Sequence, residues 1–331
     1  MKAIEIYRSC NADDLKVTEI AKPKIKENYV VVKVQAFGLN HSEVLFRKYE
    51  VDNDMFKKTV VPGIECVGTI EESLTDDFKK GDTVIALMGG MGRSFNGSYE
   101  EYALLPIKNV FKIDTKLDWI KLASIPETFY TAYGSLFICL DLKKEDTLLV
   151  RGGTSALGIA SIQMAKALGC RVIATTTDDD KSEFLDYLGV DSIIVDHNDF
   201  KDQMAEKVDK ILELVGPRTA LESMKYLRYH GICCSTGVLG GQGFFQNFDP
   251  IKSIPNGRYL TGFYSNNPTK EEIDDMFKFL NDYNISPYIG KVYTLEEVKL
   301  FQSDLEYGKT NGKGVVAVSE EAKKLVKKYR K

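Results

Sequence analysis

The chain has 331 residues, of which 44 % are hydrophobic and 28 % are charged, and its net charge at pH 7 is −4. This length suits two domains rather than one ordinary core, and the composition excludes a largely disordered chain. The negative charge disfavours nucleic acid as a partner, no apolar run is long enough to span a bilayer, and the first residues lack the apolar core of a signal peptide. We therefore expect a cytoplasmic protein with neither a nucleic-acid nor a membrane partner.

The first 120 residues or so carry strand patterns separated by turns. Residues 29–34 form a short β-branched run, and residues 81–87 follow a turn signal. Long helical periods are few in this part of the chain. The pattern predicts a β-rich first domain.

From about residue 124 to residue 265, buried-type strands alternate with helical segments. The expected strands are residues 148–150, 171–176, 192–195, 210–214 and 232–236. The expected helices are residues 156–168 and about 181–188. Strands that alternate with helices need crossover connections, which give a parallel sheet. The sequence therefore predicts a parallel α/β domain.

The end of the chain reads strand, helix, strand over residues 291–293, 295–306 and 314–318, and we expect it to return to the first domain. Lys and Arg then cluster between residues 323 and 331. Such a stretch is compatible with RNA or an acidic surface, but we prefer a solvated terminal helix.

The six cysteines form no C-x-x-C pair, so neither a zinc knuckle nor a redox dithiol is indicated. Cys233 and Cys234 are adjacent in a strand-like run, where side chains alternate between opposite faces. We expect both to be core residues of a reduced protein.

The strongest chemical signal is the turn between the predicted strand at 148–150 and the helix at 156–168. Glycines let a backbone approach a pyrophosphate, and the free N–H groups of a helix N-terminus attract its negative charge. The spacing is G-x-x-S-x-x-G rather than the usual G-x-G-x-x-G. We expect seven residues to bind the pyrophosphate of a nicotinamide dinucleotide: Gly152, Gly153, Thr154, Ser155, Ala156, Leu157 and Gly158.

The end of the next strand indicates which dinucleotide binds. A carboxylate there selects NAD, whereas neutral and basic groups admit the 2′-phosphate of NADP. Thr176, Thr177 and Lys181 suit a phosphate, while residues 178–180 are aspartates that repel one, unless they serve to cap the next helix. We expect NADPH as the cofactor, with NADH as the alternative.

Several motifs together resemble one family. Residues 148–169, LLVRGGTSALGIASIQMAKALG, resemble the cofactor segment of the zinc-independent quinone oxidoreductases of the medium-chain dehydrogenase/reductase superfamily. The other similar segments follow in the family's order: residues 38–47 (N-x-x-D-x-x-x-R), 62–68 (P-G-x-E-x-x-G), 97–102 (G-x-x-A-E-Y), 131–133 (start of the linking helix) and 312–316 (last strand). This ordered set covers nearly the whole chain.

The resemblance implies a GroES-like β-barrel domain, residues 1–123 and 266–331, and a Rossmann domain with a doubly wound parallel sheet, residues 124–265. It implies an active site in the cleft between them and hydride transfer to a small-molecule quinone or α,β-unsaturated carbonyl. Relatives of this kind commonly pair through the edges of their Rossmann sheets, so a homodimer is an expected assembly.

The resemblance also bears on metal. The zinc-dependent relatives place cysteine, histidine and cysteine at positions that match Asn40, Ile64 and Glu127 here. Isoleucine does not ligate a metal, and the other two do not replace soft or imidazole ligands. We expect no zinc, and His41 is interpreted as a hydrogen-bonding residue rather than a ligand.

Without a metal, hydrogen bonds must polarise the substrate carbonyl. Asn40 is the first candidate, facing the nicotinamide or substrate, with holding its loop as the alternative. Tyr49 either supplies a hydroxyl or packs on the barrel. Thr131, expected on the first turn of the linking helix, either binds the nicotinamide carboxamide or caps that helix. Arg47 and Glu65 are expected to support the fold.

Further cofactor contacts are expected from Gly237 and Val238, which follow a parallel strand, and from Phe263. The aromatic stretch 244–248 suits a substrate lid, a dimer contact or core packing. Two alternatives stand beside a quinone or enone reductase. One is an enoyl-thioester reductase, for which no clear basic patch is seen, and the other is a non-catalytic NADPH-binding structural or RNA-associated protein.

Overall fold

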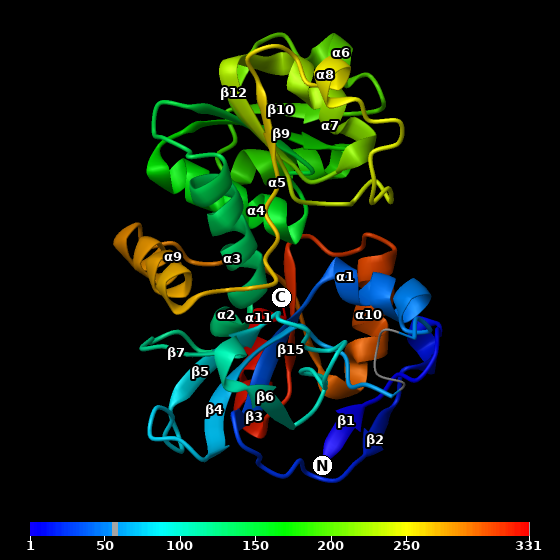
Figure 1. Ribbon diagram of the computed structural model, residues 1–331, viewed down its shortest axis with the longest axis vertical. Coiled ribbons are helices and arrows are strands. Elements are labelled where there is room, and N and C mark those ends of the chain that lie inside the picture. The colour runs from blue at the N-terminus through cyan, green and yellow to red at the C-terminus, as the bar shows by residue number, and fades with distance from the viewer. Residues whose placement is uncertain (55–58, 331) are drawn as a thin grey trace. The chain divides into compact units, whose positions relative to one another are not determined.

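The structure is a computed structural model that describes residues 1–54 and 59–330. The chain divides into two compact units, coloured along the chain in Figure 1. Unit 1 comprises Met1–Glu127, Asn266–Ile273 and Pro287–Lys331, and unit 2 comprises Thr128–Ser265 and Asp274–Ser286.

These boundaries differ from the predicted ones because of two helices. The linking helix α3 (Pro126–Tyr133) begins in unit 1 and continues into unit 2. Most of helix α9 (Lys270–Asp282) also belongs to unit 2, where the Phe279 ring packs on Phe137 with ring centroids 4.7 Å apart. The segment Asp274–Ser286, predicted in the first domain, therefore packs with the second.

Unit 1 is built mainly from antiparallel strands. Its larger sheet has the order β14-β15-β3-β4-β5-β7 with β6 paired to β3, and β1 pairs with β2 separately. The strands are β1 (Lys2–Ile4), β2 (Val17–Glu19), β3 (Tyr29–Leu39), β4 (Glu65–Ser73), β5 (Thr83–Leu87), β6 (Tyr102–Pro106), β7 (Val110–Lys112), β14 (Ile289–Thr294) and β15 (Lys313–Ala317). The helices are α1 (His41–Leu45), α2 (Trp119–Ala123), α10 (Val298–Glu306) and α11 (Glu320–Tyr329), with a π-helix η2 (Phe46–Glu50) after α1.

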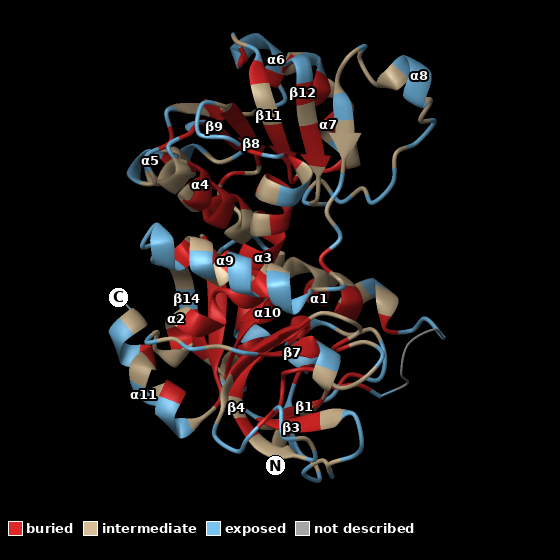
Figure 2. Ribbon diagram, turned by 60° about the vertical axis from the view of Figure 1, so that its left-hand side comes forward, coloured by how far each residue is buried: buried red, intermediate tan, exposed pale blue. Residues whose placement is uncertain are grey.

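The long strand β3 holds this sheet together. It pairs antiparallel with β4, β6 and β15, so segments from both ends of the chain meet on it. Its β-branched and aromatic residues, among them Val30, Val32 and Phe37, are fully buried in the core, which appears red in Figure 2. The return of the chain end to the first domain is thereby confirmed.

Unit 2 contains the predicted parallel sheet. Its strands are β8 (Thr147–Arg151), β9 (Arg171–Thr176), β10 (Ser192–Val195), β11 (Val208–Glu213), β12 (Leu227–Ser235) and β13 (Tyr259–Thr261). Their order is β10-β9-β8-β11-β12-β13, and all neighbours are parallel. From β8 the chain adds β9 and β10 towards one edge of the sheet, and from β11 it adds β12 and β13 towards the other edge. The point between β8 and β11 is where open α/β sheets bind ligands at their carboxyl ends.

The helices of unit 2 show how local sequence sets element ends. They are α4 (Ala156–Leu168), α5 (Ser182–Tyr187), α6 (Phe200–Gln203), α7 (Pro217–Ser223) and α8 (Pro250–Ser253), besides α9 and most of α3. Helix α4 has the predicted bounds because Ser155 caps its N-terminus and Gly169, at φ 98°, ends it in the left-handed region. Helix α5 begins one residue later than predicted, after a short 3₁₀ turn at Asp179–Lys181.

The basic tail forms the predicted terminal helix α11. Its apolar face, with Ala322 and Val326, is buried. On its polar face, the Lys328 ammonium lies 2.9 Å from an Asp118 carboxylate oxygen and the Lys323 ammonium lies 3.5 Å from Glu296. Charges paired within the protein favour the solvated-helix interpretation over an RNA contact; Lys331 lies outside the described residues.

Candidate cofactor and active site

The predicted phosphate-binding turn follows β8 at the switch point of the parallel sheet. Two hydrogen bonds tie the turn to Thr175 of the neighbouring strand β9: the Gly152 amide donates to its side-chain hydroxyl at 3.1 Å, and the Gly153 amide donates to its backbone carbonyl at 2.9 Å. On its other side the turn meets the end of β11, where the Leu214 amide donates to the Arg151 carbonyl at 3.1 Å. The turn is therefore anchored between the ends of two strands.

Two glycines in the turn disfavour a side chain, Gly152 by its backbone conformation and Gly158 by lack of room. Gly152 has φ +91°, a region that only glycine adopts readily. A Cβ on Gly158 would overlap the Gly152 carbonyl oxygen and would lie 2.8 Å from the Gly153 Cα, so the helix packs directly on the turn backbone. This close approach is what a pyrophosphate cradle requires.

Ser155 shapes the turn from within. Its hydroxyl donates to the Gly152 carbonyl at 2.9 Å and accepts from the Gly158 amide at 3.0 Å, so it is the N-cap of α4. Ala156 and Leu157 occupy the first two positions of the helix, whose amides have no acceptor inside a helix. Together with the helix dipole, these amides make the end of α4 a place for an anion.

The predicted 2′-phosphate residues lie at the end of β9. Thr176 is buried, and its hydroxyl accepts from the Asp178 amide at 3.2 Å. The Asp178 carboxylate accepts from the Asp180 amide and so caps the 3₁₀ turn, the structural role considered for these aspartates. The Lys181 ammonium lies 3.6 Å from the Asp178 carboxylate, and Thr177 is exposed. The three predicted 2′-phosphate residues therefore lie close in the chain to the Asp178 carboxylate. The Lys181 ammonium partly neutralises the negative charge of that carboxylate.

Gly237 and Val238 follow β12 and lie beside the turn. The Leu239 amide donates to the Leu214 carbonyl at 3.0 Å, and a Cβ on Gly152 would lie 3.0 Å from the Leu239 Cδ1. Leu214 and Leu239 were not among the predicted site residues. The glycines that follow β8, β11 and β12 were the signal in the sequence that these strand ends lie at the site. The ends of β8, β11 and β12 thus meet at one edge of the sheet.

A cavity of about 400 Å³ opens beside this edge. It is lined at the ends of β12 and β13 by Thr236, Thr261 and Gly262, and by Phe244 and Phe245 of the aromatic stretch. Phe244 is 84 % exposed, which excludes core packing for this residue.

Phe263 is fixed in place by the linking helix. Its ring contacts Tyr130 edge-on with ring centroids 5.4 Å apart, and a side chain on Gly134 would overlap the ring. Phe263 therefore packs against α3 and the segment that continues it.

The position of Thr131 corrects the prediction. Helix α3 begins at Pro126, so Thr131 lies on its last turn rather than its first, and an N-cap role for Thr131 is wrong. Proline suits the first position of a helix because its fixed φ is helical and its missing N–H has no partner to lose. Thr131 is 5 % exposed.

Asn40 belongs to a buried polar cluster in unit 1. Its side-chain amide donates to the Glu65 carboxylate at 2.8 Å, and its side-chain oxygen accepts from the Lys313 ammonium at 2.7 Å. Lys313 also contacts Glu65 at 2.5 Å, and both of these side chains are at most 2 % exposed. The Glu127 amide donates to the other Glu65 oxygen at 2.8 Å. These contacts favour the loop-holding role of Asn40 and show Glu65 supporting three segments of the fold.

Glu43 lies in the same cluster. Its carboxylate accepts from the Asn40 amide at 2.6 Å and from the Ile64 amide at 3.0 Å. Burial raises the pKa of Glu43 from its ordinary value of 4.5 to about 8, and the nearby Lys313 offsets only part of that shift.

The raised pKa predicts a pH-dependent stability. Folded Glu43 holds its proton to higher pH than unfolded Glu43, so its contribution is complete below about pH 4.5 and is lost as the pH rises towards 8. The loss is roughly 1.4 kcal/mol for each pH unit of this window. In urea unfolding between pH 5 and 8, the stability of Glu43→Gln relative to the unmodified protein should rise with pH. A difference that stays flat for Glu43→Gln over this range would contradict the prediction.

Arg47 is buried and Tyr49 is exposed, so the two residues have different roles. The fully buried Arg47 guanidinium donates to Gln302 at 3.0 Å and to Glu306 at 2.6 Å, a structural role as predicted. Tyr49 lies in the π-helix η2 and is 68 % exposed, so it does not pack into the barrel core.

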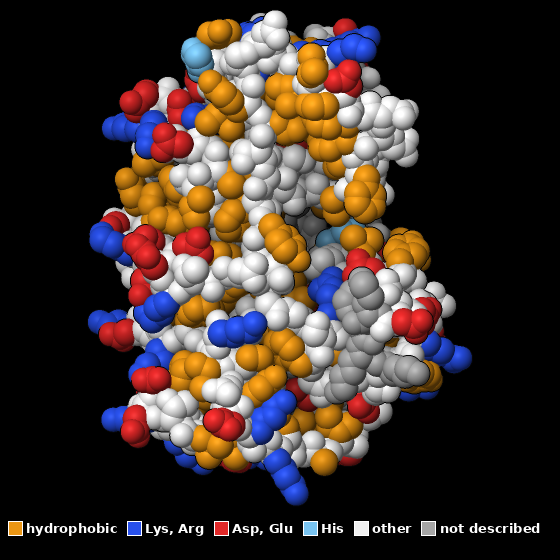
Figure 3. All heavy atoms as spheres, viewed as in Figure 1, with side chains coloured by type: hydrophobic (Ala, Val, Ile, Leu, Met, Phe, Trp, Pro, Cys, Tyr) orange, Lys and Arg blue, Asp and Glu red, His pale blue; other side chains and the backbone are white. Residues whose placement is uncertain are grey.

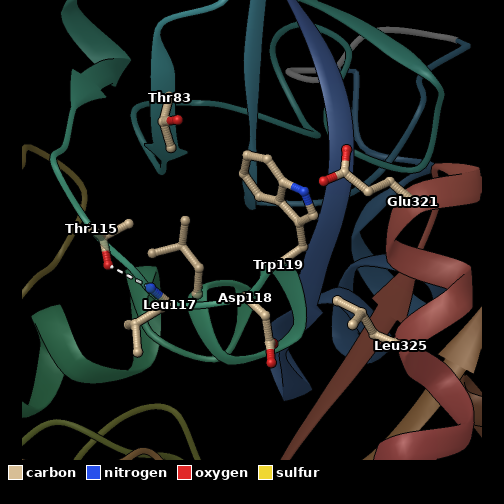
Figure 4. A pocket seen from close by; sticks show the side chains of 8 residues that line it. Thr83, Thr115, Leu117, Asp118, Trp119, Glu321 and Leu325 are labelled. Carbon is tan, nitrogen blue, oxygen red and sulfur yellow. Dashed lines mark hydrogen bonds between the residues drawn. The ribbon is translucent and has the colours of Figure 1, made fainter.

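A second cavity, of about 320 Å³, lies within unit 1 (Figure 4). It lies between α2 and α11, with Trp119, Leu122, Glu321 and Leu325 among its lining residues. The Glu321 carboxylate points toward the Trp119 ring, whereas the Asp118 carboxylate points away from it (Figure 4). The sequence reasoning did not find this cavity, and it contains none of the predicted site residues.

The described part of the chain, residues 1–54 and 59–330, offers neither a metal-binding cluster nor a membrane-spanning helix. In these ranges no three His, Cys, Asp or Glu side chains are grouped so that they could hold a metal ion. Over the same ranges, no helix has the length and apolar character needed to cross a membrane. On the face seen in Figure 3, acidic and basic side chains are interspersed.

Comparisons with known proteins agree with this architecture. The family model described as alcohol dehydrogenase GroES-like domain matches residues 26–115, and that described as zinc-binding dehydrogenase matches residues 156–282. The chain is 26 % identical to the quinone oxidoreductase of Homo sapiens over 322 residues, covering 93 % of this chain and 94 % of that protein.

Two solved structures share the fold. The quinone oxidoreductase from Coxiella burnetii matches with a TM-score of 0.83 at 24 % identity, over 96 % of this chain and 99 % of that one. A mycobacterial protein solved in complex with NADPH matches with a TM-score of 0.81 at 24 % identity, over 96 % of this chain and 100 % of that one. The predicted pairing of a Rossmann sheet with a GroES-like domain is confirmed. The chain belongs to the medium-chain dehydrogenase/reductase superfamily, in its quinone oxidoreductase-like family.

Proposed function

We propose that this protein is an NADPH-dependent reductase of quinones or α,β-unsaturated carbonyl compounds. The observation that carries the proposal is the turn from Gly152 to Gly158, where Gly152 has a positive φ and Gly158 leaves no room for a side chain beside the amides that begin α4. A pyrophosphate fits this arrangement because the turn offers N–H donors, a helix dipole and close backbone approach. The NADPH complex of the mycobacterial relative supports the choice of dinucleotide.

Different residues bind different parts of the cofactor. The amides of Ala156 and Leu157 hold the pyrophosphate, Thr176, Thr177 and Lys181 hold the 2′-phosphate, and the loop with Gly237 and Val238 contacts the nicotinamide end. When bound, the reduced nicotinamide supplies a hydride to the electron-poor acceptor. Asn40 and Thr131 remain proposed substrate or carboxamide contacts. The Asn40 side chain donates to Glu65 and accepts from Lys313, which makes positioning its main role.

Turnover tests the proposed activity. Purified protein is incubated with NADPH and separate panels of quinones, enones, enals and enoyl thioesters, while the absorbance of the reduced cofactor is followed. We expect oxidation of NADPH with at least one quinone or enone. Saturable NADPH binding without turnover on any acceptor would overturn the reductase and support a non-catalytic binding protein. Turnover restricted to enoyl thioesters would replace the proposed substrate class.

Lys181 provides a test of cofactor choice. Removing its ammonium in Lys181→Ala should weaken NADPH binding roughly tenfold, because a charge-assisted contact to the 2′-phosphate is lost. The affinity for NADH, which lacks that phosphate, should change little. Lys252→Ala is a matched control, since the Lys252 ammonium lies 3.5 Å from an aspartate three residues before it, much as that of Lys181 lies 3.6 Å from Asp178. Equal effects of Lys181→Ala on both cofactors would contradict the assignment.

A further inference from the structure

The cavity between α2 and α11 in unit 1 combines an apolar lining with an aromatic ring and a carboxylate. Three leucines line it: Leu122 is fully buried, and Leu117 and Leu325 are partly buried. The Glu321 carboxylate points toward the ring of Trp119, which is also partly buried (Figure 4). The volume of about 320 Å³ lies at the lower end of the range for small-molecule sites.

The spacing of residues on α11 explains why its acidic side chain lines this cavity. Glu321 and Leu325 are four residues apart and Lys328 follows three residues later, so the three lie on one face of the helix. The Lys328 ammonium lies 2.9 Å from the Asp118 carboxylate at the start of α2, and the Tyr329 hydroxyl donates to the same carboxylate at 2.6 Å. The last turn of α11 is therefore tied to α2, and Glu321 occupies the opposite end of the same face.

The negative charge of Glu321 has no partner within residues 1–54 and 59–330. Across these ranges the Glu321 carboxylate forms no ion pair, and neither a cation nor a second aromatic ring contacts the Trp119 ring. The adjacent Glu320 differs, because its carboxylate lies 3.3 Å from the Lys323 ammonium. Lys328, on the same face as Glu321, is bound to a different carboxylate. The cavity therefore carries a negative charge that the described part of the protein does not balance.

A carboxylate beside an indole ring is a combination that suits an organic cation. The face of an indole ring carries the negative part of its quadrupole, so tryptophan attracts cations more strongly than any other side chain with an aromatic ring. A carboxylate accepts charge-assisted hydrogen bonds from an ammonium group. Leucine side chains gain free energy by covering an alkyl chain. An anion would be repelled by Glu321, and a neutral compound would gain nothing from its charge.

We propose that this cavity is a binding site for a small alkylammonium ion. The ammonium group donates to the Glu321 carboxylate and lies against the Trp119 ring, while the alkyl chain lies against Leu122 and Leu325. All the lining residues belong to unit 1, whereas the phosphate-binding turn belongs to unit 2. The site is therefore additional to the proposed reductase activity and does not rest on it.

The protein reports on this site directly, because Trp119 is its single tryptophan. Hexylammonium is titrated into the full chain at pH 7 without NADPH, and tryptophan emission is excited at a wavelength that tyrosine does not absorb. We expect a saturable change in emission with a dissociation constant of about 1 mM or tighter. Hexanol has the same chain without the charge and hexanoate has the opposite charge, so each should bind at least roughly tenfold more weakly. Hexanol binding as tight as that of hexylammonium, or no saturable change with hexylammonium, would overturn the proposal.

Two adjacent glutamates supply matched variants. Glu321→Gln removes the proposed partner of the ammonium and should weaken hexylammonium binding at least roughly tenfold. Glu320→Gln removes an equal charge from the next residue, whose side chain is 87 % exposed and paired with Lys323, and should leave the affinity unchanged. Equal losses in the two variants would reveal a general attraction to the acidic start of α11 and would contradict the site.

Replacement of Trp119 tests the ring by a separate measurement. Calorimetry takes the place of fluorescence, and urea unfolding verifies that each variant is folded. Trp119→Leu should bind hexylammonium several-fold more weakly, and Trp119→Phe should retain more of the affinity because phenylalanine also has an aromatic face. Unchanged affinity in a folded Trp119→Leu protein would overturn the role of the ring. If that variant does not fold, the comparison of Glu321→Gln with Glu320→Gln still decides whether the site exists.

Discussion

Replacement of Gly158 by alanine is expected to lower the affinity for NADPH by at least roughly a hundredfold, or about 2.7 kcal/mol. The added methyl would overlap the Gly152 carbonyl oxygen and would lie 2.8 Å from the Gly153 Cα, both parts of the backbone. Backbone atoms yield less readily than the end of a flexible side chain, so the turn must move away from the start of α4. The amides that hold the pyrophosphate then no longer converge.

A matched substitution separates this effect from a general loss of stability. A Cβ on Gly243, in the same unit, would meet no atom within 4 Å, so Gly243→Ala should bind NADPH normally. Reduced-nicotinamide fluorescence measures the affinities, and urea unfolding verifies that both variants are folded. A folded Gly158→Ala protein with unchanged affinity would show that the turn does not hold the cofactor.

Replacement of Lys313 by methionine should lower the free energy of unfolding by about 3–5 kcal/mol, since it leaves a buried carboxylate without its partner. The Lys313 ammonium contacts both the Glu65 carboxylate and the Asn40 side-chain oxygen. Lys313 and Glu65 are almost completely shielded from water, so neither charge is replaced by solvent. The Asn40 loop and the start of α3 should loosen together, because Glu65 also holds the Glu127 amide.

An exposed ion pair provides the comparison for this variant. The Lys2 ammonium lies 2.9 Å from Glu296, but both side chains are 43 % exposed, so Lys2→Met should cost far less than Lys313→Met. Adding Glu65→Gln to Lys313→Met should recover part of the loss, because the unpaired charge is then removed. Urea unfolding at pH 7 measures all four proteins. A cost below about 1 kcal/mol for Lys313→Met would contradict the buried-pair account.

Local chemistry made much of unit 2 predictable. Helix α4 was predicted with its observed bounds because Ser155 and Gly169 mark its ends, and strand β9 because its apolar run stops at a turn. The start of helix α3 was predicted about one turn and a half too late. The helix begins at Pro126, and the family motif at 131–133, taken as its start, lies near its end. Boundaries marked by a cap or a left-handed glycine are readable from sequence, and motif position alone is a weaker guide.

Contacts between distant segments were not predictable in the same way. Lys313 and Glu65 are 248 residues apart, and only the register of β15 on β3 and of β3 on β4 brings them together. The phosphate turn, by contrast, is formed by consecutive residues, so its pattern was visible in the sequence.

Hydrogen–deuterium exchange with and without NADPH tests the central claim most directly, because it locates the cofactor without altering any residue. Saturating NADPH should slow amide exchange in peptides that cover residues 152–158, with weaker protection around residues 237–238. Peptides from α11 in unit 1 should be unaffected and serve as the internal control. Protection that saturates elsewhere, with residues 152–158 unchanged at millimolar NADPH, would contradict the assignment of this turn as the dinucleotide site.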